Sequence, residues 1–252
     1  MKPDFLVTVA SRQEIRPLLD RSRILKETVS DQGRTVLICE IAGRSYKVLI
    51  TGPGIMNTVQ ALTWMMEKSR TRVVLQVGIA GFFTQSGLDM GDICLAESER
   101  YIHSGLETSG SAFPLAPLPF ELIEEKPQTR YGLMPVDQGM TALVHTMLNT
   151  ELANSPFRVK RLPMITVSTV TATDTRADEL FCAFHAGMEA MEGAAAAHVA
   201  SLYNSGFLEM RAGSNRVGKR DTASWDIPLA ADHLSRALET VILKGDLWHP
   251  GE

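Results

Sequence analysis

Short apolar runs along the chain alternate with longer segments in which apolar residues recur at helical spacing. The first run, Phe5–Ala10, has the length and composition of a buried strand. The predicted strands are 5–10, 34–40, 45–50, 73–77, 92–96, 164–168 and 207–212. The predicted helices are 57 or 58 to 69, 141–152, 176–184, 192–204 and 228–244. This alternation predicts an α/β fold.

Glycine-containing segments separate several of these elements. Gly43 lies between the strands 34–40 and 45–50 and predicts a hairpin. Residues 51–54 precede a helix but lack the Gly-Lys-Ser/Thr ending of a nucleoside triphosphate loop, so a tight turn is favoured. Residues 78–81 (Gly-Ile-Ala-Gly) follow the strand 73–77. Glycines there allow a ligand to approach the backbone closely, although they also mark ordinary turns.

The segment 110–135 differs in composition from the rest of the chain. It carries prolines at 114, 117, 119, 127 and 135. A proline-rich stretch of this length inside a compact domain is typical of a functional loop or an irregular excursion. Because no interdomain linker is recognisable, we expect one domain over 1–252, with a proline-rich loop at about 110–135.

Composition and charge argue against several classes of protein. The hydrophobic share of 44% and the charged share of 21% are those of a globular chain, and a net charge of −4 offers no basic surface for nucleic acid. No apolar run has membrane-spanning length, and Lys2 and Asp4 lie too close to the first strand for a signal peptide. Cys39, Cys94 and Cys182 lack zinc or disulfide spacing. We expect reduced thiols, no membrane partner and a cytoplasmic protein.

Two polar residues are expected at one edge of the sheet. Glu192 begins the alanine-rich helix 192–204, and Asn215 comes just past the end of the strand 207–212. In open α/β sheets, ligands bind beyond the carboxyl ends of the strands. A carboxylate there can hold a diol, and an amide can donate one hydrogen bond and accept another, as a 6-oxopurine requires.

Both residues also have simpler interpretations. Glu192 can be a favourable charge at a helix N-terminus, and Asn215 can belong to an Asx-type turn. Against the first interpretation, Gly193 and the surrounding alanines offer the Glu192 carboxylate no side-chain partner. A buried carboxylate needs a hydrogen-bonding partner, which a ribose diol would supply.

The motifs around these residues resemble those of the purine nucleosidase and nucleoside phosphorylase superfamily, and most of all those of the futalosine hydrolase family. They are Ala-Met-Glu-Gly-Ala-Ala at 190–195, Gly-Ser-Asn at 213–215 with Gly-Lys-Arg-Asp at 218–221 and Trp225, and the segment 166–174. The resemblance covers most of the chain. It implies a three-layer α/β/α fold with a mixed, twisted central sheet. It also implies a small nucleoside substrate, a homodimer or higher homo-oligomer, and no cofactor or metal.

The same resemblance implies an activity and the residues that carry it. The activity is N-glycosidic hydrolysis of futalosine, a benzoate-bearing inosine analogue, with release of hypoxanthine in menaquinone biosynthesis. Glu14, followed by Ile15, matches the base that activates the attacking water, whereas its position alone indicates only a favourable helix charge. Asn215 matches the residue that holds the leaving purine. The implied substrate-binding residues are Glu192, Met191, Ala80, Gly81, Thr173 and Arg220.

Departures from the family pattern leave alternatives open. Ala190 replaces the first glutamate of a Glu-Met-Glu motif, so that glutamate's role does not carry over. Hexameric phosphorylases hold phosphate with Arg and Ser where this chain has Gln76 and Ile79, which favours water as the nucleophile. Superfamily members that cleave 6-aminopurines usually have Asp at the position of Asn215. The alternatives are a purine nucleoside phosphorylase, a methylthioadenosine/S-adenosylhomocysteine-type nucleosidase, and a non-catalytic purine nucleoside-binding protein.

The benzoate of such a substrate needs an aromatic contact and an anchor for its carboxylate. The candidates are the stretch 113–120 for the ring and Arg216, Lys219 or Arg220 for the charge. The simpler interpretation is that these cations belong to a solvated loop, with Arg220 paired to Asp221 or Asp226. The histidines show no metal spacing.

Overall fold

A mixed β-sheet forms the centre of the protein, and the computed structural model describes residues 5–108 and 111–248, without the side chains of 111–114, 247 and 248. The strands of the sheet are β1 (Phe5–Val9), β2 (Arg23–Val29), β3 (Thr35–Ile41), β4 (Arg44–Ile50), β5 (Val73–Phe82), β6 (Ile93–Tyr101), β9 (Leu133–Met134), β10 (Val159–Thr166), β11 (Met188–Ala190) and β12 (Gly206–Arg216). Their order is β11-β10-β6-β12-β5-β1-β4-β3-β2, and β9 pairs with β6.

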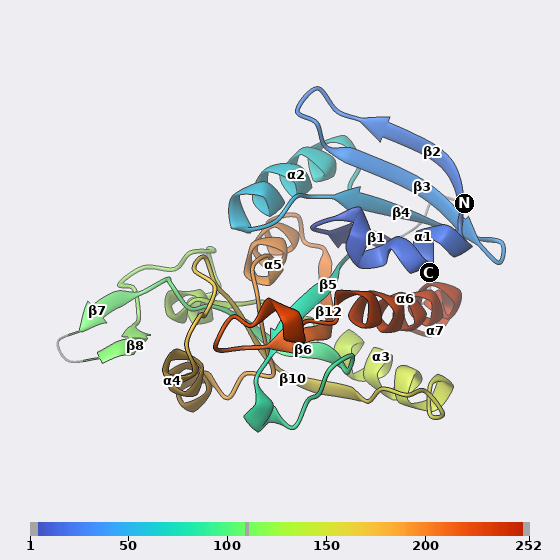
Figure 1. Cartoon of the computed structure of the whole chain (residues 1–252). Coiled ribbons are helices and arrows are strands. Elements are labelled where there is room, and N and C mark those ends of the chain that lie inside the picture. The colour runs from blue at the N-terminus through green and yellow to red at the C-terminus, as the bar shows by residue number, and fades with distance from the viewer. Residues whose placement is uncertain (1–4, 109–110, 249–252) are drawn as a thin grey trace.

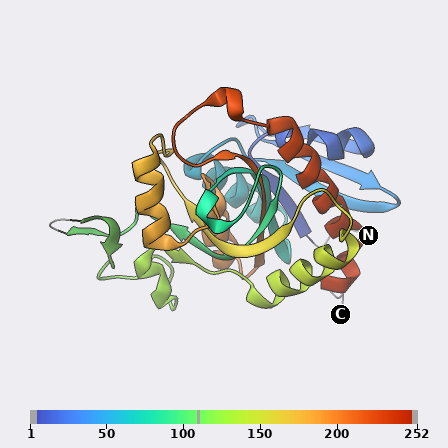
Figure 2. The ribbon, with the colours of Figure 1, turned by 60° about the horizontal axis from the view of Figure 1, so that its bottom comes forward.

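Helices cover both faces of the sheet (Figures 1 and 2). They are α1 (Arg16–Arg21), α2 (Ile55–Lys68), α3 (Gln138–Glu151), α4 (Asp174–Phe184), α5 (Gly193–Leu202), α6 (Ile227–Leu243) and α7 (Gly245–Trp248). Short 3-10 helices are η1 (Arg12–Ile15), η2 (Thr84–Ser86), η3 (Pro127–Tyr131) and η4 (Thr222–Ser224).

Alternation along the central strands explains this layering. In β1, Phe5, Val7 and Val9 pack with α3 and α6, whereas Leu6 packs with α2 and α5 on the opposite face. A parallel strand buried on both faces reads as a continuous apolar run, which is how β1 was predicted from sequence. The three-layer α/β/α fold with a mixed sheet, expected from the sequence, is confirmed.

The sheet curls at one end, so that β11 pairs with two strands. It runs parallel to β10 and antiparallel to β5, where Glu189 lies opposite Gly81. On the other side of β5, Gly81 lies opposite Asn215 of β12. This closure brings residues just before α5 beside the carboxyl end of β5, and it cannot be read from local sequence because β11 has only three residues.

Most predicted elements are present, with shifted boundaries. Helix α2 starts at Ile55, earlier than predicted, and β5 continues through the glycines to Phe82. Strand β12 also runs further than predicted, to Arg216, with an irregularity between Gly213 and Asn215. Asn215 therefore lies inside a strand and not beyond it. The pattern did not predict the exposed edge strand β2.

The proline-rich segment contains more regular structure than a loop. It includes β8 (Ser111–Ala116), which pairs with β7 (Leu106–Thr108), as well as η3 and β9. The β7–β8 hairpin extends away from the helices that flank the sheet (Figure 1). Among the described residues, no helix combines the length and the apolar character needed to cross a membrane.

Candidate active site

A cavity of about 350 Å³ opens where the strands β1, β5 and β12 reach their carboxyl ends. Its walls come from the segment after β1, the end of β5, the β11–α5 junction and the end of β12. Of the residues predicted to form the site, the cavity is lined by Glu14, Ala80, Gly81, Met191, Glu192, Asn215 and Arg220. These residues are far apart in sequence, and the fold brings them together.

Glu14 lies in η1 and is only 8% exposed. Its Oε1 accepts hydrogen bonds from the backbone N–H and the hydroxyl of Ser11, each at 2.9 Å. Its Oε2 accepts the backbone N–H of Ile79 at 3.1 Å, across the gap to β5. Burial raises the pKa of Glu14, and Arg211 and the hydrogen bonds only partly oppose that rise. A buried carboxyl with a raised pKa that faces a cavity is suited to proton transfer.

Gly78 makes room for this glutamate. A Cβ at Gly78 would lie 2.6 Å from Glu14 Oε2 and 2.5 Å from Arg211 Nη1. The sequence suggested that glycines in this segment allow a ligand to approach the backbone. At Gly78 the approaching groups are instead two charged side chains of the protein itself.

Glu192 has protein partners that the sequence did not reveal. Its Oε1 accepts the backbone N–H of Gly54 at 2.8 Å, and its Oε2 accepts from Arg211 Nη1 at 3.1 Å. The prediction that Glu192 lacks a side-chain partner is therefore wrong, because Arg211 of β12 is its partner. The predicted turn at 51–54 also contributes to the site, since Gly54 adopts φ 86° and directs its N–H at Glu192.

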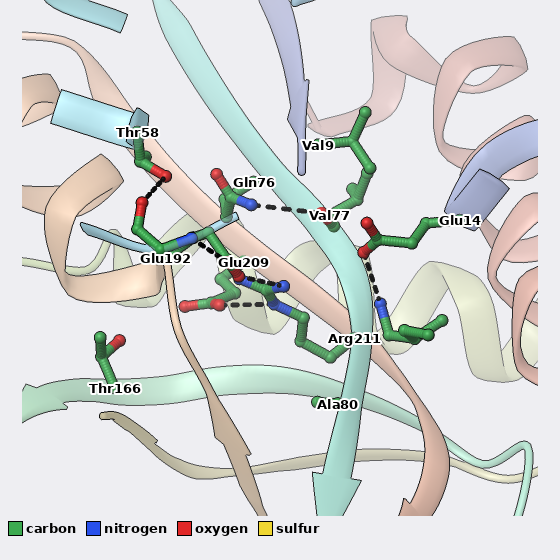
Figure 3. A network of polar contacts seen from close by, with 12 residues as sticks. Val9, Glu14, Thr58, Gln76, Val77, Ala80, Thr166, Glu192, Glu209 and Arg211 are labelled. Atoms are coloured by element: carbon green, nitrogen blue, oxygen red, sulfur yellow. Dashed lines mark hydrogen bonds and ion pairs between the residues drawn. The ribbon is translucent and has the colours of Figure 1, made fainter. Parts of the chain in front are cut away.

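Arg211 is the main site residue that sequence reasoning missed. It is fully buried in β12, where Nε donates to Glu209 at 2.8 Å and Nη1 to Glu192 (Figure 3). Burial disfavours its charge, but Glu209 and Glu192 outweigh that cost and raise the pKa of Arg211. One signal was available: Glu209 and Arg211 are opposite charges two residues apart in a buried strand, so both must point to one face.

Asn215 is half-buried at the cavity wall. Its Oδ1 accepts from Ser214 Oγ at 2.9 Å, and its Nδ2 donates to the Arg216 carbonyl at 3.1 Å. These contacts fix the amide, yet one N–H and one oxygen lone pair remain for a ligand. A Cβ at Gly81 would meet Asn215 Nδ2 at 3.3 Å and Val217 at 2.9 Å, so a glycine keeps this wall open.

Glu189 is a second missed residue at the cavity. It is 6% exposed and accepts from the backbone N–H of Thr171 at 3.0 Å and from its hydroxyl at 2.5 Å. Burial raises the pKa of Glu189. Thr171 lines the cavity, whereas the predicted Thr173 is not among its lining residues; Thr173 instead caps α4 by accepting the backbone N–H of Arg176.

The outer end of the cavity is cationic and aromatic. Arg216 and Arg220 line it and are exposed, and the Arg220 guanidinium lies 5.0 Å from the centre of the Trp225 ring. Lys219 is not among the lining residues, although its backbone N–H donates to Asp174. Asp221 and Asp226 accept backbone N–H groups at the starts of η4 and α6, and within the described ranges neither forms an ion pair with Arg220. The expected carboxylate partner of Arg220 is thus replaced by an aromatic one.

The described part of the stretch 113–120 does not line the cavity. Residues 115–120 are absent from the lining of the cavity, and Phe120 is exposed. The side chain of Phe113 lies outside the described part of the chain. Trp225, by contrast, is an aromatic residue that lines the cavity.

The two positions compared with phosphate-binding residues are occupied. Gln76 is fully buried, accepts from Thr8 at 2.7 Å and donates to the Val77 carbonyl at 3.2 Å. The backbone N–H of Ile79 donates to Glu14. Neither residue carries a cationic group for a phosphate dianion, and Gln76 is not among the residues that line the cavity. Within the described ranges, no group of three or more His, Cys, Asp or Glu side chains could hold a metal ion.

The chain belongs to the phosphorylase superfamily, whose family model matches residues 4–243. It is 28% identical over 202 residues to the futalosine hydrolase of Thermus thermophilus, a match that covers 80% of this chain and 83% of that protein. It is 25% identical over 229 residues to the 5'-methylthioadenosine/S-adenosylhomocysteine nucleosidase of Bacillus cereus, covering 86% and 87%.

A solved structure shares the fold over nearly the whole length. The 5'-methylthioadenosine/S-adenosylhomocysteine nucleosidase of Colwellia psychrerythraea, in complex with adenine, gives a TM-score of 0.79 at 18% identity and covers 96% of this chain and 95% of that chain. The superfamily expected from the sequence motifs is therefore confirmed. Because the relatives are nucleosidases, the likeness supports nucleoside N-glycosidic hydrolysis as the class of activity.

Proposed function

We propose that this protein hydrolyses the N-glycosidic bond of futalosine, a 6-oxopurine nucleoside with a carboxylate-bearing aromatic 5' substituent, and thereby releases hypoxanthine. The observation that carries this proposal is the pair Glu14 and Asn215 on one cavity. Glu14 is a buried carboxyl with a raised pKa, and Asn215 is a fixed amide that lines the same cavity. Likeness to a futalosine hydrolase supports the same reaction.

In this mechanism, Glu14 takes a proton from a water on the ribose face opposite the base. Cleavage passes through an oxocarbenium-like state in which negative charge develops on the departing purine. As the glycosidic bond breaks, N7 of the purine takes up a proton from water, and the proton that Glu14 has taken returns to solvent. Asn215 donates to O6 and accepts from the protonated N7, which stabilises the leaving group. Glu192 and Met191 bind the ribose, with Ala80 and Gly81 along its edge. Glu192 is held ready for the diol by Gly54 and Arg211.

The 6-oxopurine preference has a second support in Glu189. Gly81 lies between Glu189 and Asn215 on adjacent strands, so the two side chains flank an open strip of backbone. A 6-oxopurine carries an N1–H donor, which a carboxylate can accept, while a 6-aminopurine has a lone pair at N1 that a carboxylate repels. An unmet buried polar group costs about 1–3 kcal/mol, enough to set base preference.

The 5' end of the substrate would lie against the outer end of the cavity. Trp225 supplies an aromatic surface, and Arg216 and Arg220 supply cations for a carboxylate. Thr173 and Lys219 lie off the cavity and are left out of the proposal. We keep homo-oligomer formation, expected from the resemblance, as part of the proposal, with light scattering as its test.

Turnover by purified protein tests the function directly. Futalosine, inosine, adenosine and methylthioadenosine are compared, with released base measured by chromatography. We expect hydrolysis of futalosine and weaker hydrolysis of inosine, with no acceleration by phosphate. If phosphate accelerates the reaction and ribose 1-phosphate products accumulate, the protein is a phosphorylase. Preference for the 6-aminopurines would make it a nucleosidase of the methylthioadenosine type. Saturable binding without turnover would identify a nucleoside-binding protein.

A further inference from the structure

Several buried glutamates surround one buried arginine, Arg211, behind the candidate active site. Glu99 of β6 and Glu209 of β12 are fully buried, and they lie with Glu14 and Glu192 around Arg211. Neither Glu99 nor Glu209 lines the cavity. The mechanism proposed above uses neither of them, although burying charge without a function or a partner is costly.

The Glu209 carboxylate occupies space that is free because residue 193 is a glycine. A Cβ at Gly193, the first residue of α5, would overlap both carboxylate oxygens of Glu209. Gly193 does not have a positive φ, so backbone conformation does not explain the glycine. The glycine of the Met-Glu-Gly-Ala-Ala motif is therefore required by a side chain from β12, which comes to lie against the N-terminus of α5.

Glu99 and Glu209 form a pair that needs a proton. Glu99 Oε1 accepts from Thr166, whose hydroxyl oxygen in turn accepts the backbone N–H of Ala194 in α5. The Oε2 atoms of both glutamates have no donor among the described residues, and the two carboxyl groups face each other. Burial and the charge of Glu209 raise the pKa of Glu99 well above its usual range, so Glu99 carries the proton.

Arg211 lies between two sets of carboxylates. Nε donates to Glu209, Nη1 donates to Glu192, and Nη2 has no hydrogen-bond partner among the described residues. Arg211 Nη1 and Glu14 Oε2 both lie close to the position of a Gly78 Cβ, so they are within about 5 Å of each other. The guanidinium is thus near enough to pair with Glu14, but its hydrogen bonds go to the other two glutamates.

We propose that Glu209 is a positioning residue that holds Arg211 through Nε on the side away from Glu14. Arg211 can then anchor Glu192 without pairing with Glu14 and neutralising its carboxylate. The proposal rests on the proposed function only in giving Glu14 the role of base. A guanidinium that paired with Glu14 would stabilise the carboxylate, lower its pKa and weaken it as a base. Glu209 therefore preserves the basicity of Glu14 from behind the site.

Within the described part of the chain, the charged groups that act most strongly on Glu14 are Arg211, which lowers its pKa, and Glu192, which raises it. Glu209 faces Arg211, Glu99 and the buried thiol of Cys94 in β6. Burial raises the pKa of Cys94, so this thiol stays neutral at the pH of an assay. Removing the charge of Glu209 leaves Arg211 less compensated and draws it toward Glu14. The pKa of Glu14 must then fall, and the acid limb of the pH profile must move to lower pH.

The first experiment compares Glu209→Gln with the matched control Glu99→Gln. Both remove a carboxyl from the same buried pair, but only Glu209 contacts Arg211. For Glu209→Gln, we expect the acid limb of kcat/KM to move down by about one pH unit or more and kcat to fall about tenfold. KM should rise by less than about threefold, because Glu192 keeps its hydrogen bond from the backbone N–H of Gly54 when Arg211 moves. Glu99→Gln should keep the wild-type profile. An unmoved limb in Glu209→Gln, or the same shift in both variants, overturns the proposal.

A second measurement does not depend on turnover. In protein labelled with ¹³C at the glutamate carboxyl carbons, the Glu14 resonance is assigned by its loss in Glu14→Gln and titrated by NMR. We expect its midpoint to fall in Glu209→Gln and to stay at the wild-type value in Glu99→Gln. A shifted midpoint in a protein without nucleosidase activity would support the positioning role and refute the proposed function. Normal nucleosidase activity of the wild type together with an unshifted midpoint in Glu209→Gln would support the proposed function and refute the positioning role.

Gly193 provides a test that keeps the charge. Gly193→Ala places a methyl group against the Glu209 carboxylate, and Glu209→Asp shortens that side chain by one methylene. We expect Gly193→Ala to lower kcat about tenfold. The double variant Gly193→Ala/Glu209→Asp should have a kcat at least about twofold above that of Gly193→Ala alone. Circular dichroism checks that each variant is folded. If Glu209→Gln does not fold, the comparison of Gly193→Ala with the double variant tests the proposal by itself. A double variant that is no more active than Gly193→Ala overturns the proposal.

Discussion

The two ends of the cavity differ in how their polar side chains are held. At the inner end, Glu14 and Glu192 line the cavity and Arg211 lies behind them. Each is at most 8% exposed, and each contacts at least two other groups of the protein. At the outer end, Arg216 and Arg220 are exposed, and the Arg220 guanidinium lies over the face of Trp225.

In the function proposed here, this difference separates the residues that carry out the reaction from those that select the 5' group of the substrate. Side chains that transfer protons or bind developing charge must be fixed before the substrate arrives, because reorganisation in the transition state costs rate. A cation at the rim works in water, where its attraction to a carboxylate is screened and its loss is tolerated. We therefore expect substitutions at the inner end to lower the rate by orders of magnitude and those at the outer end to change substrate preference slightly.

The largest effect is expected for Glu14→Gln. The amide keeps the size and some hydrogen bonds of the glutamate but cannot take a proton from water, so kcat for futalosine should fall about 10²- to 10⁴-fold. The dissociation constant, measured by calorimetry, should stay within about threefold of wild type. Equal loss of binding and turnover would mean that Glu14 holds the ribose and that another group activates the water.

Asn215→Ala is expected to have the next largest effect. Loss of one fixed donor and acceptor at the leaving group should lower kcat/KM by about 10²-fold. Asn215→Asp should shift the preference from inosine toward adenosine, because an ionised carboxylate repels O6 and accepts from a 6-amino group. Steady-state kinetics with both nucleosides measures the ratio. Unchanged kinetics in the alanine variant would remove Asn215 from the mechanism.

The inner end was only partly predictable from sequence, for reasons that particular residues make clear. Asn215 and Glu192 stand next to recognisable elements, so their places at the sheet edge followed from local patterns. Arg211 lies within a strand that was identified by its apolar residues, and its partner Glu192 is 19 positions away in sequence. Glu189 lies in a three-residue strand whose pairing with Gly81 exists only once the sheet has curled.

The outer end shows the opposite limitation. Its cations were identified from sequence, but their partners were not. Arg220 stacks on Trp225 instead of pairing with Asp221 or Asp226, because those carboxylates accept backbone N–H groups at the starts of η4 and α6. Competition between a backbone cap and an ion pair depends on geometry that a sequence pattern does not contain.

The buried glutamates behind the inner end should also make the stability of the protein depend on pH, an effect that the exposed cations of the outer end should lack. The pKa of Glu99 is raised in the folded protein by burial and by Glu209, so folding takes up a proton at this residue. Its contribution to stability is full below the ordinary glutamate pKa and is lost as pH rises through the folded value. The slope contributed by one proton is at most about 1.4 kcal/mol per pH unit. Urea unfolding from pH 4 to 9 should show a shallower decline in Glu99→Gln, and an identical decline would mean that Glu99 is ionised in the native state.

The smallest effect is expected at the outer end, for Arg220→Ala. The Arg220 guanidinium is exposed, so its contact with a substrate carboxylate is worth about 1 kcal/mol or less, and the ratio of kcat/KM for futalosine to that for inosine should fall about three- to fivefold. Inosine has no 5' carboxylate, so its own kcat/KM should hardly change, which separates recognition from damage to the site. Raising the salt concentration should reduce the wild-type preference toward that of the variant, because the interaction is screened. Arg216→Ala tests the second cation in the same way, and Lys219→Ala, which lies off the cavity, is the control. A preference that survives both Arg220→Ala and Arg216→Ala would mean that the carboxylate is bound elsewhere.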